Sequence, residues 1–331
     1  MNKNHLPHRA AAAAIVIIVA LAGASIRAAD NYPSRPVRMI IPFAAGGPTD
    51  IVGRIMAAKM SELLHRQFVV EDRTGAGGNI GAGYVAEAAP DGYTLLMATA
   101  STNAINPGLY RHMPYDAIRD FAPLGRVGVT PTLLLVNPSN PATDVKSLVA
   151  LIKANPGKYS YGSGGVGSIL HLCGEEFKSL AGGLDIVHVP YRGSAPMDTD
   201  LMSGQVTMAF DPTPTAMPLA RAGKVRALGA GMATRLSAMP NLLTLQEQGI
   251  KGFECYTWNA ILAPAGTPAP IVNKLNAAIN NSLADSIVFA ALQNAGVDPT
   301  PHSTPATTGE FLQAELKKWA PIIKASGAHV D

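Results

Sequence analysis

Cysteine is almost absent from this sequence, and its histidines are scattered. The chain of 331 residues contains 2 cysteines, Cys173 and Cys255, which are too few for the disulfide framework of a small secreted domain. A single disulfide between them is compatible with an exported protein, but sequence gives no distance between the two side chains and leaves the bond open. The 8 histidines lack the spacing of metal ligands. We therefore expect no metal site.

An excess of either charge is also absent once the N-terminus is set aside. The 26 basic and 23 acidic residues give a formal charge of +3, and Lys3, Arg9 and Arg27 account for that excess. These three lie within residues 1–28, where an apolar run from 10 to 24 and then small residues follow, as in a signal peptide. We expect cleavage and export to the periplasm, with a retained anchor as the alternative. The balanced remainder indicates no nucleic-acid partner.

Three glycine-rich turns each join a predicted strand to a predicted helix. The first, at 43–50, follows the apolar run 37–41, and the others lie at 75–81 and 162–168. Glycine lets the main chain approach a ligand closely, and the free N–H groups at a helix start favour a carboxylate or phosphate. An ordinary strand-to-helix turn is the alternative for any one of them. Their recurrence favours an anion site.

Strands alternate with helices throughout, which predicts α/β domains with parallel sheets and ligands at the carboxyl ends of strands. A strand at 133–136 is expected to begin a second domain, and an aromatic-rich segment at 252–262 to return the chain to the first. The predicted limits are residues 29–128 plus 256–331 for domain 1, and 129–255 for domain 2. The two sheets would face each other across a cleft.

Enzyme functions for the loop at 162–167 have sequence arguments against them. The loop matches G-x-G-x-x-G, but Asp185 opens the next predicted strand, whereas a dinucleotide site needs an acid at that strand's end. Ser163, His171 and Asp211 have an order that is wrong for an α/β-hydrolase, and no G-x-S-x-G is present there. We expect no cofactor and no catalysis, with a secreted hydrolase as the weaker alternative.

Two charged residues at predicted strand ends have open roles. Asp211 is expected either to bind a ligand amine or hydroxyl or to cap the turn before Pro212. Arg192 is the cation placed at a strand end beside small residues, and it would either bind a distal carboxylate or lie solvated at the rim. Tyr191 and Phe43 are expected to line the pocket or to pack below it.

Several long motifs occur in one order along the chain: PFAAGGPTD at 42–50, GAGGNIG at 75–81, YGSGGVGS at 161–168, VPYRG at 189–193 and FD at 210–211. This order resembles the Bug family of extracytoplasmic solute receptors, which serve tripartite tricarboxylate transporters. The resemblance covers essentially the whole mature chain. It implies a type II periplasmic binding protein, with two doubly wound α/β domains that close on a carboxylate.

The resemblance also implies ligand contacts from both domains. Those of domain 1 are Phe43, Ala45, Gly46, Thr49, Asp50, Gly78, Thr99 and Ser101. Those of domain 2 are Gly164, Val166, Gly167, Ser168, His171, Tyr191 and Asp211. Ala45 replaces the family's usual proline, and Pro48 replaces a smaller residue and removes a backbone donor, so the ligand's identity stays open.

Partners follow from the same resemblance. They are a small-molecule carboxylate and the membrane subunits of a transporter, with the receptor itself a monomer. A ligand-sensing domain that signals to a membrane partner is the alternative, because both functions need the same closure. Asp50, in the first turn of its helix, is expected to bind a ligand donor and to affect selectivity more than folding.

Overall fold

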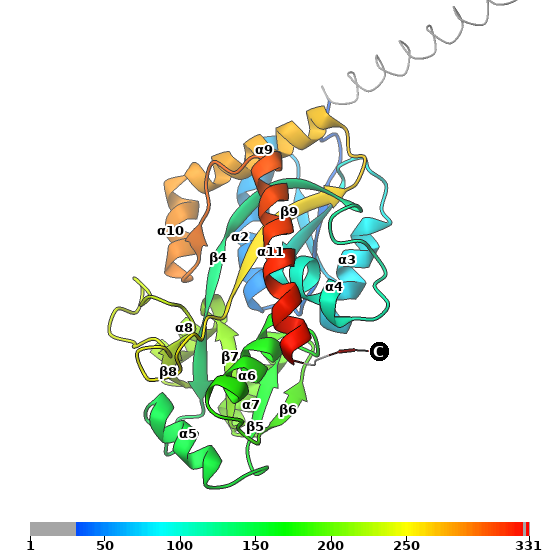
Figure 1. Ribbon diagram of the computed structural model, residues 1–331. Coiled ribbons are helices and arrows are strands. Elements are labelled where there is room, and N and C mark those ends of the chain that lie inside the picture. Colours follow the sequence, from blue (N-terminus) through cyan, green and yellow to red (C-terminus); the bar gives the residue numbers. More distant parts are fainter. Residues whose placement is uncertain (1–30, 327–328, 331) are drawn as a thin grey trace, which may run out of the picture.

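The structure is a computed structural model that describes residues 31–326 and 329–330. The predicted signal peptide, residues 1–28, lies outside these residues. A long strand, β4 (Phe121–Val136), runs the length of the molecule, with one group of elements at each end (Figure 1). We call these two groups domain 1 and domain 2.

Domain 1 holds the N-terminal and the C-terminal elements. They are β1 (Val37–Ile41), α2 (Pro48–Leu64), β2 (Phe68–Asp72), η1 (Ala76–Gly78), α3 (Asn79–Ala86), β3 (Thr94–Thr99), η2 (Ser101–Ile105), α4 (Asn106–Leu109), β9 (Tyr256–Pro264), α9 (Ala269–Ala284), α10 (Ser286–Asn294), β10 (Asp298–Pro299) and α11 (Pro305–Ser326). Figure 1 shows α9 and α10 over the far end of this domain, while α11 runs back along β4 toward domain 2.

Domain 2 holds the middle of the chain. Its elements are α5 (Val145–Lys153), β5 (Ser160–Ser163), α6 (Ile169–Leu180), β6 (Val187–Pro190), α7 (Ser194–Ser203), β7 (Met208–Pro212), α8 (Thr213–Arg221) and β8 (Arg226–Ala230). The predicted strand 37–41 and the predicted helix start at Pro48 are confirmed. The helix α8 was not predicted, because Pro214 and Pro218 interrupt its pattern.

One continuous sheet joins the domains in the order β2-β1-β3-β9-β4-β7-β5-β6, with β8 and β10 paired to β4. The outer strands are parallel, as β1 is to β2 and β3, and β5 to β6 and β7. The central strands β9 and β4 are antiparallel to their neighbours. The expectation of purely parallel sheets is therefore corrected: the two crossing strands are antiparallel.

The strand β4 is shared by both domains. It pairs with β9 as far as Pro131 and with β7 from Thr132 onward. Only its last four residues were predicted as a strand, because Pro123, Gly125 and Gly128 break the apolar pattern of the rest. The structure accommodates these residues through two irregularities in the β4–β9 register.

The core follows the alternation of each strand. In β1, Met39 and Ile41 belong to the hydrophobic cluster beneath domain 1, whereas Ile40 belongs to the cluster that continues into domain 2. Successive side chains of a strand point to opposite faces, so helices cover β1 on both sides. Because helices cover the faces of the sheet, the strand ends are the part that a ligand can contact.

Candidate ligand cleft

The ends of five strands meet between the domains. Phe43 and Ser101 follow β1 and β3, Gly164 and Gly193 follow β5 and β6, and Pro212 is the last residue of β7. Three helices, α2, α6 and α7, begin at the same place. Free N–H groups at a helix start carry partial positive charge and favour an anion.

A small chamber of about 30 Å³ lies at this meeting point. It is lined by Phe43, Pro48, Thr49, Thr99, Ser101, Gly164, Ser168, Ile169, Leu170, Gly193, Ser194, Pro212 and Thr257. Its polar side chains are hydroxyls, and no charged side chain belongs to this lining. An anion bound there would be held by hydroxyls, backbone N–H groups and helix dipoles instead of by a cation.

A wider groove of about 510 Å³ opens beside the chamber. Its lining is Phe43, Thr74, Gly75, Ala76, Gly77, Gly78, Ile80, Tyr110, Gly164, Gly165, Val166, Pro190, Tyr191 and Arg192. Phe43 and Gly164 belong to both linings. The two compartments are therefore adjacent, and Arg192 is the one charged residue in either lining.

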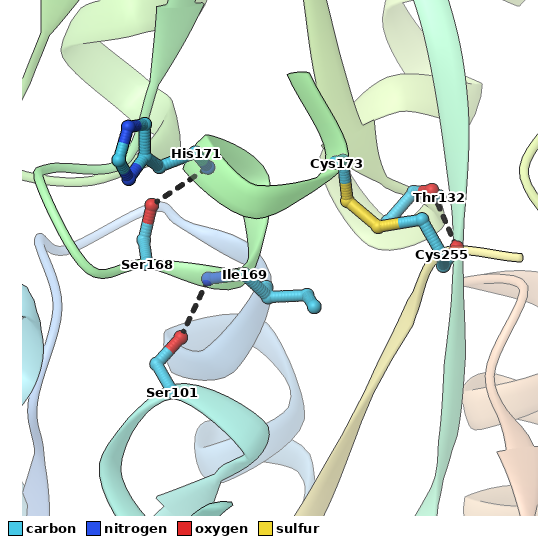
Figure 2. The surroundings of a disulfide bond; sticks show 7 residues. All are labelled: Ser101, Thr132, Ser168, Ile169, His171, Cys173 and Cys255. Atoms are coloured by element: carbon cyan, nitrogen blue, oxygen red, sulfur yellow. Dashed lines mark hydrogen bonds between the residues drawn. A yellow bond between two sulfur atoms is a disulfide. The ribbon is translucent and has the colours of Figure 1, made fainter. Parts of the chain in front are cut away.

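Hydrogen bonds cross between the domains at the chamber. The backbone N–H of Ile169, at the start of α6, donates to Ser101 Oγ at 2.9 Å (Figure 2). The hydroxyl of Tyr110 donates to the carbonyl oxygen of Val166 at 3.0 Å. Both bonds need the two domains in contact, so the structure has the closed arrangement.

Two glycines allow this close approach. At Gly167, with φ +85°, an added Cβ would lie 2.8 Å from the Tyr110 ring. At Gly193, with φ +126°, it would lie 3.1 Å from the backbone nitrogen of Ala44. Both φ values favour glycine, and both glycines face the other domain.

The predicted contact residues divide into two groups. Those that line the chamber or the groove are Phe43, Thr49, Gly78, Thr99, Ser101, Gly164, Val166, Ser168 and Tyr191. Those that line neither compartment are Ala45, Gly46, Asp50, Gly167, His171 and Asp211. The role of each as a ligand contact stays a prediction.

Asp50 supports the first glycine turn from behind. Its side chain accepts a hydrogen bond from the backbone N–H of Gly46 at 2.8 Å and an ion pair from Arg54 at 2.7 Å. The residue is 3% exposed. Its carboxylate is thus engaged in holding the turn.

Asp211 lies behind the hydroxyl of Ser194, beside a second buried acid, Asp198. Burial raises the pKa of Asp198, and the neighbouring Asp211 raises it further. Burial also raises the pKa of Asp211, while hydrogen bonds from Ser194 and Thr215 lower it. Because burial favours the protonated form of each carboxyl, the pair carries less than its full charge.

A histidine pair supports the loop at 163–168. His188 Nε2 lies 2.7 Å from Ser163 Oγ, and the backbone N–H of Gly167 donates to His171 Nδ1 at 3.5 Å. The two imidazole rings stack with centroids 4.2 Å apart. Burial lowers the pKa of both, and that of His188 falls to about 4. The histidine that contacts the Ser163 hydroxyl is thus His188. Ser163, His171 and Asp211 do not form a hydrolase-like triad.

The cysteines form a disulfide between α6 and the residue before β9. The Cα atoms of Cys173 and Cys255 are 5.7 Å apart. The carbonyl oxygen of Cys255 also accepts a hydrogen bond from Thr132 Oγ1 at 2.7 Å (Figure 2). The bond left open by the sequence is therefore present, and it ties the helix that starts at the chamber to the crossing strands.

Several lining residues were missed by the sequence analysis. Thr257 enters the chamber from β9, and Tyr110 enters the groove from the end of α4. Neither belongs to a glycine turn. Each reaches the cleft through the tertiary fold, which local sequence patterns do not reveal. Ser194 was within reach of sequence reasoning, because it directly follows the VPYRG motif.

The described residues show neither a metal-binding cluster nor a membrane-spanning helix. Among residues 31–326 and 329–330, no group of three or more His, Cys, Asp or Glu side chains is placed to hold a metal ion. Within the same ranges, no helix combines the length and the apolar character needed to cross a bilayer.

Two α/β domains that share crossing strands and close glycine turns over a chamber define a type II periplasmic binding protein fold. The sequence profile of the tripartite tricarboxylate transporter family receptor matches residues 52–328. The chain belongs to this family.

Similar proteins agree with this assignment. Protein BugT of Bordetella pertussis is 36% identical over 318 residues, which cover 96% of this chain and 97% of BugT. The structure of the periplasmic binding protein BugD has a TM-score of 0.87 at 35% identity and covers 90% of this chain and 99% of that one. An R. palustris protein solved with adipate has a TM-score of 0.87 at 37% identity, covering 90% of this chain and 100% of its own. The predicted Bug-type solute receptor and its fold are confirmed.

Proposed function

We propose that the protein captures a small carboxylate by closure of its two domains and delivers it to the membrane subunits of a tripartite tricarboxylate-type transporter. The observation that carries the proposal is the uncharged chamber lined by hydroxyls at the starts of α2, α6 and α7. The similar protein that was solved with adipate supports a carboxylate as the ligand class.

A carboxylate in the chamber would accept hydrogen bonds from both domains. Thr49, Thr99 and Ser101 offer hydroxyls from domain 1, while Ser168 and Ser194 offer them from domain 2. Hydrogen bonds to an ionised acceptor are stronger than neutral ones, so an anion between these groups favours the closed arrangement over the open one. Capture and closure are then one equilibrium.

Localisation and assembly belong to the same proposal. Removal of residues 1–28 would release a monomeric receptor into the periplasm. Its domain boundaries would lie between residues 128 and 129 and between residues 255 and 256. The first boundary is close to the point where β4 changes its pairing partner. We propose binding without catalysis, since Ser163 lines neither the chamber nor the groove.

A thermal-shift screen tests the proposal. The mature protein is unfolded, dialysed and refolded to remove any carried-over ligand, and then heated with a panel of carboxylates and their amides. A ligand at about a hundred times its Kd adds roughly 2.7 kcal/mol to the free energy of unfolding, which raises the Tm visibly.

The outcomes separate the candidate functions. A response to a carboxylate that is lost with its amide supports the receptor, and mass spectrometry should recover that acid unchanged. Chemical conversion of the acid would indicate an enzyme. No response to any acid would contradict the proposal and favour another class of ligand.

A further inference from the structure

Arg192 differs from the other arginines in the part of the chain that the structure describes. Each of the others has a hydrogen bond, an ion pair or a ring contact, as Arg73 has with Glu71 and Arg226 has with backbone carbonyls. The exposed side chain of Arg192 has none of these. An arginine at a binding groove with its donors unused is available for an anion.

The position of Arg192 relates it to the chamber. It follows β6 directly and lines the groove, which shares Phe43 and Gly164 with the chamber. A ligand that starts in the chamber can therefore extend past Phe43 and Gly164 into the groove that Arg192 lines. The chamber can bind one anionic group, and the groove can bind a second.

Apolar side chains form part of the groove lining. Ile80 is 55% exposed and Val166 is 36% exposed, although both are large hydrophobic residues in a folded protein. The rings of Tyr110 and Tyr191 line the same groove. Exposed apolar side chains that surround a cleft indicate that an apolar body covers them when the cleft is filled.

We propose that Arg192 binds a second anionic group of the ligand, and that the ligand is an unsubstituted dicarboxylate with an extended apolar body. This inference rests on the proposed function and specifies its ligand class. One carboxylate lies in the chamber, the hydrocarbon body lies against Ile80 and Val166, and the far carboxylate pairs with the Arg192 guanidinium. Short hydroxylated acids are disfavoured, because they would place hydroxyls against apolar side chains.

Calorimetric titration of the refolded mature protein tests this inference. The probes are hexanedioate and octanedioate, each compared with its monoamide, which keeps the shape and removes one charge. A charge-assisted pair with arginine predicts that the better dicarboxylate binds roughly tenfold to a hundredfold more tightly than its monoamide. In Arg192→Gln this difference should disappear while monoamide affinity stays unchanged. Arg119→Gln, at an exposed site outside the cleft, is the matched control and should keep the difference.

Each other outcome has a defined meaning. A dicarboxylate preference that persists in Arg192→Gln would overturn the role of Arg192. Equal affinities for the dicarboxylate and its monoamide in the wild type would overturn the second anionic group. Failure of every acid to bind would overturn the receptor proposal itself, and this inference with it.

Discussion

At the scale of single residues, the side chains behind the chamber matter as much as those that line it. Asp50 accepts the N–H of Gly46 and pairs with Arg54, and His188 meets Ser163 on the opposite side of the cleft. These contacts fix the glycine turns on which the backbone donors lie. A change behind the chamber should therefore act on every ligand alike.

Asp50→Ala should lower the affinity for all acids and also destabilise the protein. The backbone N–H of Gly46 loses a charged acceptor, and a hydrogen bond of this kind is worth about 1.5–3 kcal/mol. Denaturant unfolding and calorimetry measure the two effects, with Glu62→Ala on the same helix as the control, because Glu62 forms only an exposed ion pair with Lys59. An altered ranking of acids without loss of stability would restore the ligand-binding role expected from the sequence.

The histidine pair predicts a loss of stability in acid. Burial, followed by the charge of His171, lowers the pKa of His188 from 6.5 to about 4, while Glu175 opposes this shift and Lys178 adds to it. The folded state thus favours the neutral ring. The stability that this ring contributes is complete above pH 6.5 and is lost as the pH falls toward 4.

The measurement is the urea midpoint of the wild type and of His188→Gln at several pH values. Glutamine can keep a hydrogen bond to Ser163 but does not titrate, so the variant should lose less stability between neutral and acidic pH. Parallel pH profiles for the two proteins would exclude this histidine as the source.

At the scale of elements, the disulfide joins α6 to the crossing strands. Cys173 and Cys255 are separated by 82 residues in sequence. Cross-linking so long a loop reduces the entropy of the unfolded chain, and the chain-entropy estimate is about 4–5 kcal/mol. Since measured values for native disulfides are commonly lower, we expect reduction to lower the free energy of unfolding by about 2–5 kcal/mol.

Denaturant unfolding with and without a reductant measures this effect. Cys173→Ser/Cys255→Ser should match the reduced wild type and should not respond to the reductant. Equal stability of the oxidised and reduced wild type would show that the bond constrains neither state.

The elements that sequence predicted best are those with a local signal. Helix α6 begins after Gly167 and Ser168, and Ser168 caps it by accepting the N–H of His171, so the helix predicted after the turn at 162–168 is confirmed. The strand β4 was mostly missed, since its prolines and glycines are tolerated only beside β9. Motif resemblance supplied the hydroxyls of the chamber, whereas Thr257 and Tyr110 reach the cleft through long-range folding that no local pattern encodes.

At the scale of the whole molecule, closure depends on close contacts between the backbone of one domain and the backbone or an aromatic ring of the other. Gly167 faces Tyr110 and Leu109 of the other domain, and a Cβ at Gly167 would approach both. Few side chains can be accommodated at such a contact. The glycines of the loops therefore serve domain approach as well as ligand contact.

Gly167→Ala should hinder closure and lower ligand affinity at least roughly tenfold, because contact energy and domain approach are lost together. Small-angle scattering should show a smaller compaction on addition of a saturating dicarboxylate. Gly183→Ala is the matched control, because its φ of +76° carries similar backbone strain while nothing lies within 4 Å of the added Cβ. Equal effects of the two variants would attribute the loss to backbone strain alone.

The division of the cleft into a chamber and a groove has an evolutionary consequence. Under the proposed function the chamber would bind its ligand through hydroxyls and main chain at the starts of three helices, so most changes there would damage folding and binding together. The groove is lined by exposed side chains such as Ile80, Val166 and Arg192, which can be replaced without disturbing the core. After gene duplication, single substitutions in the groove could therefore change the ligand specificity of one copy. Both copies would keep the chamber that is proposed to bind the carboxylate.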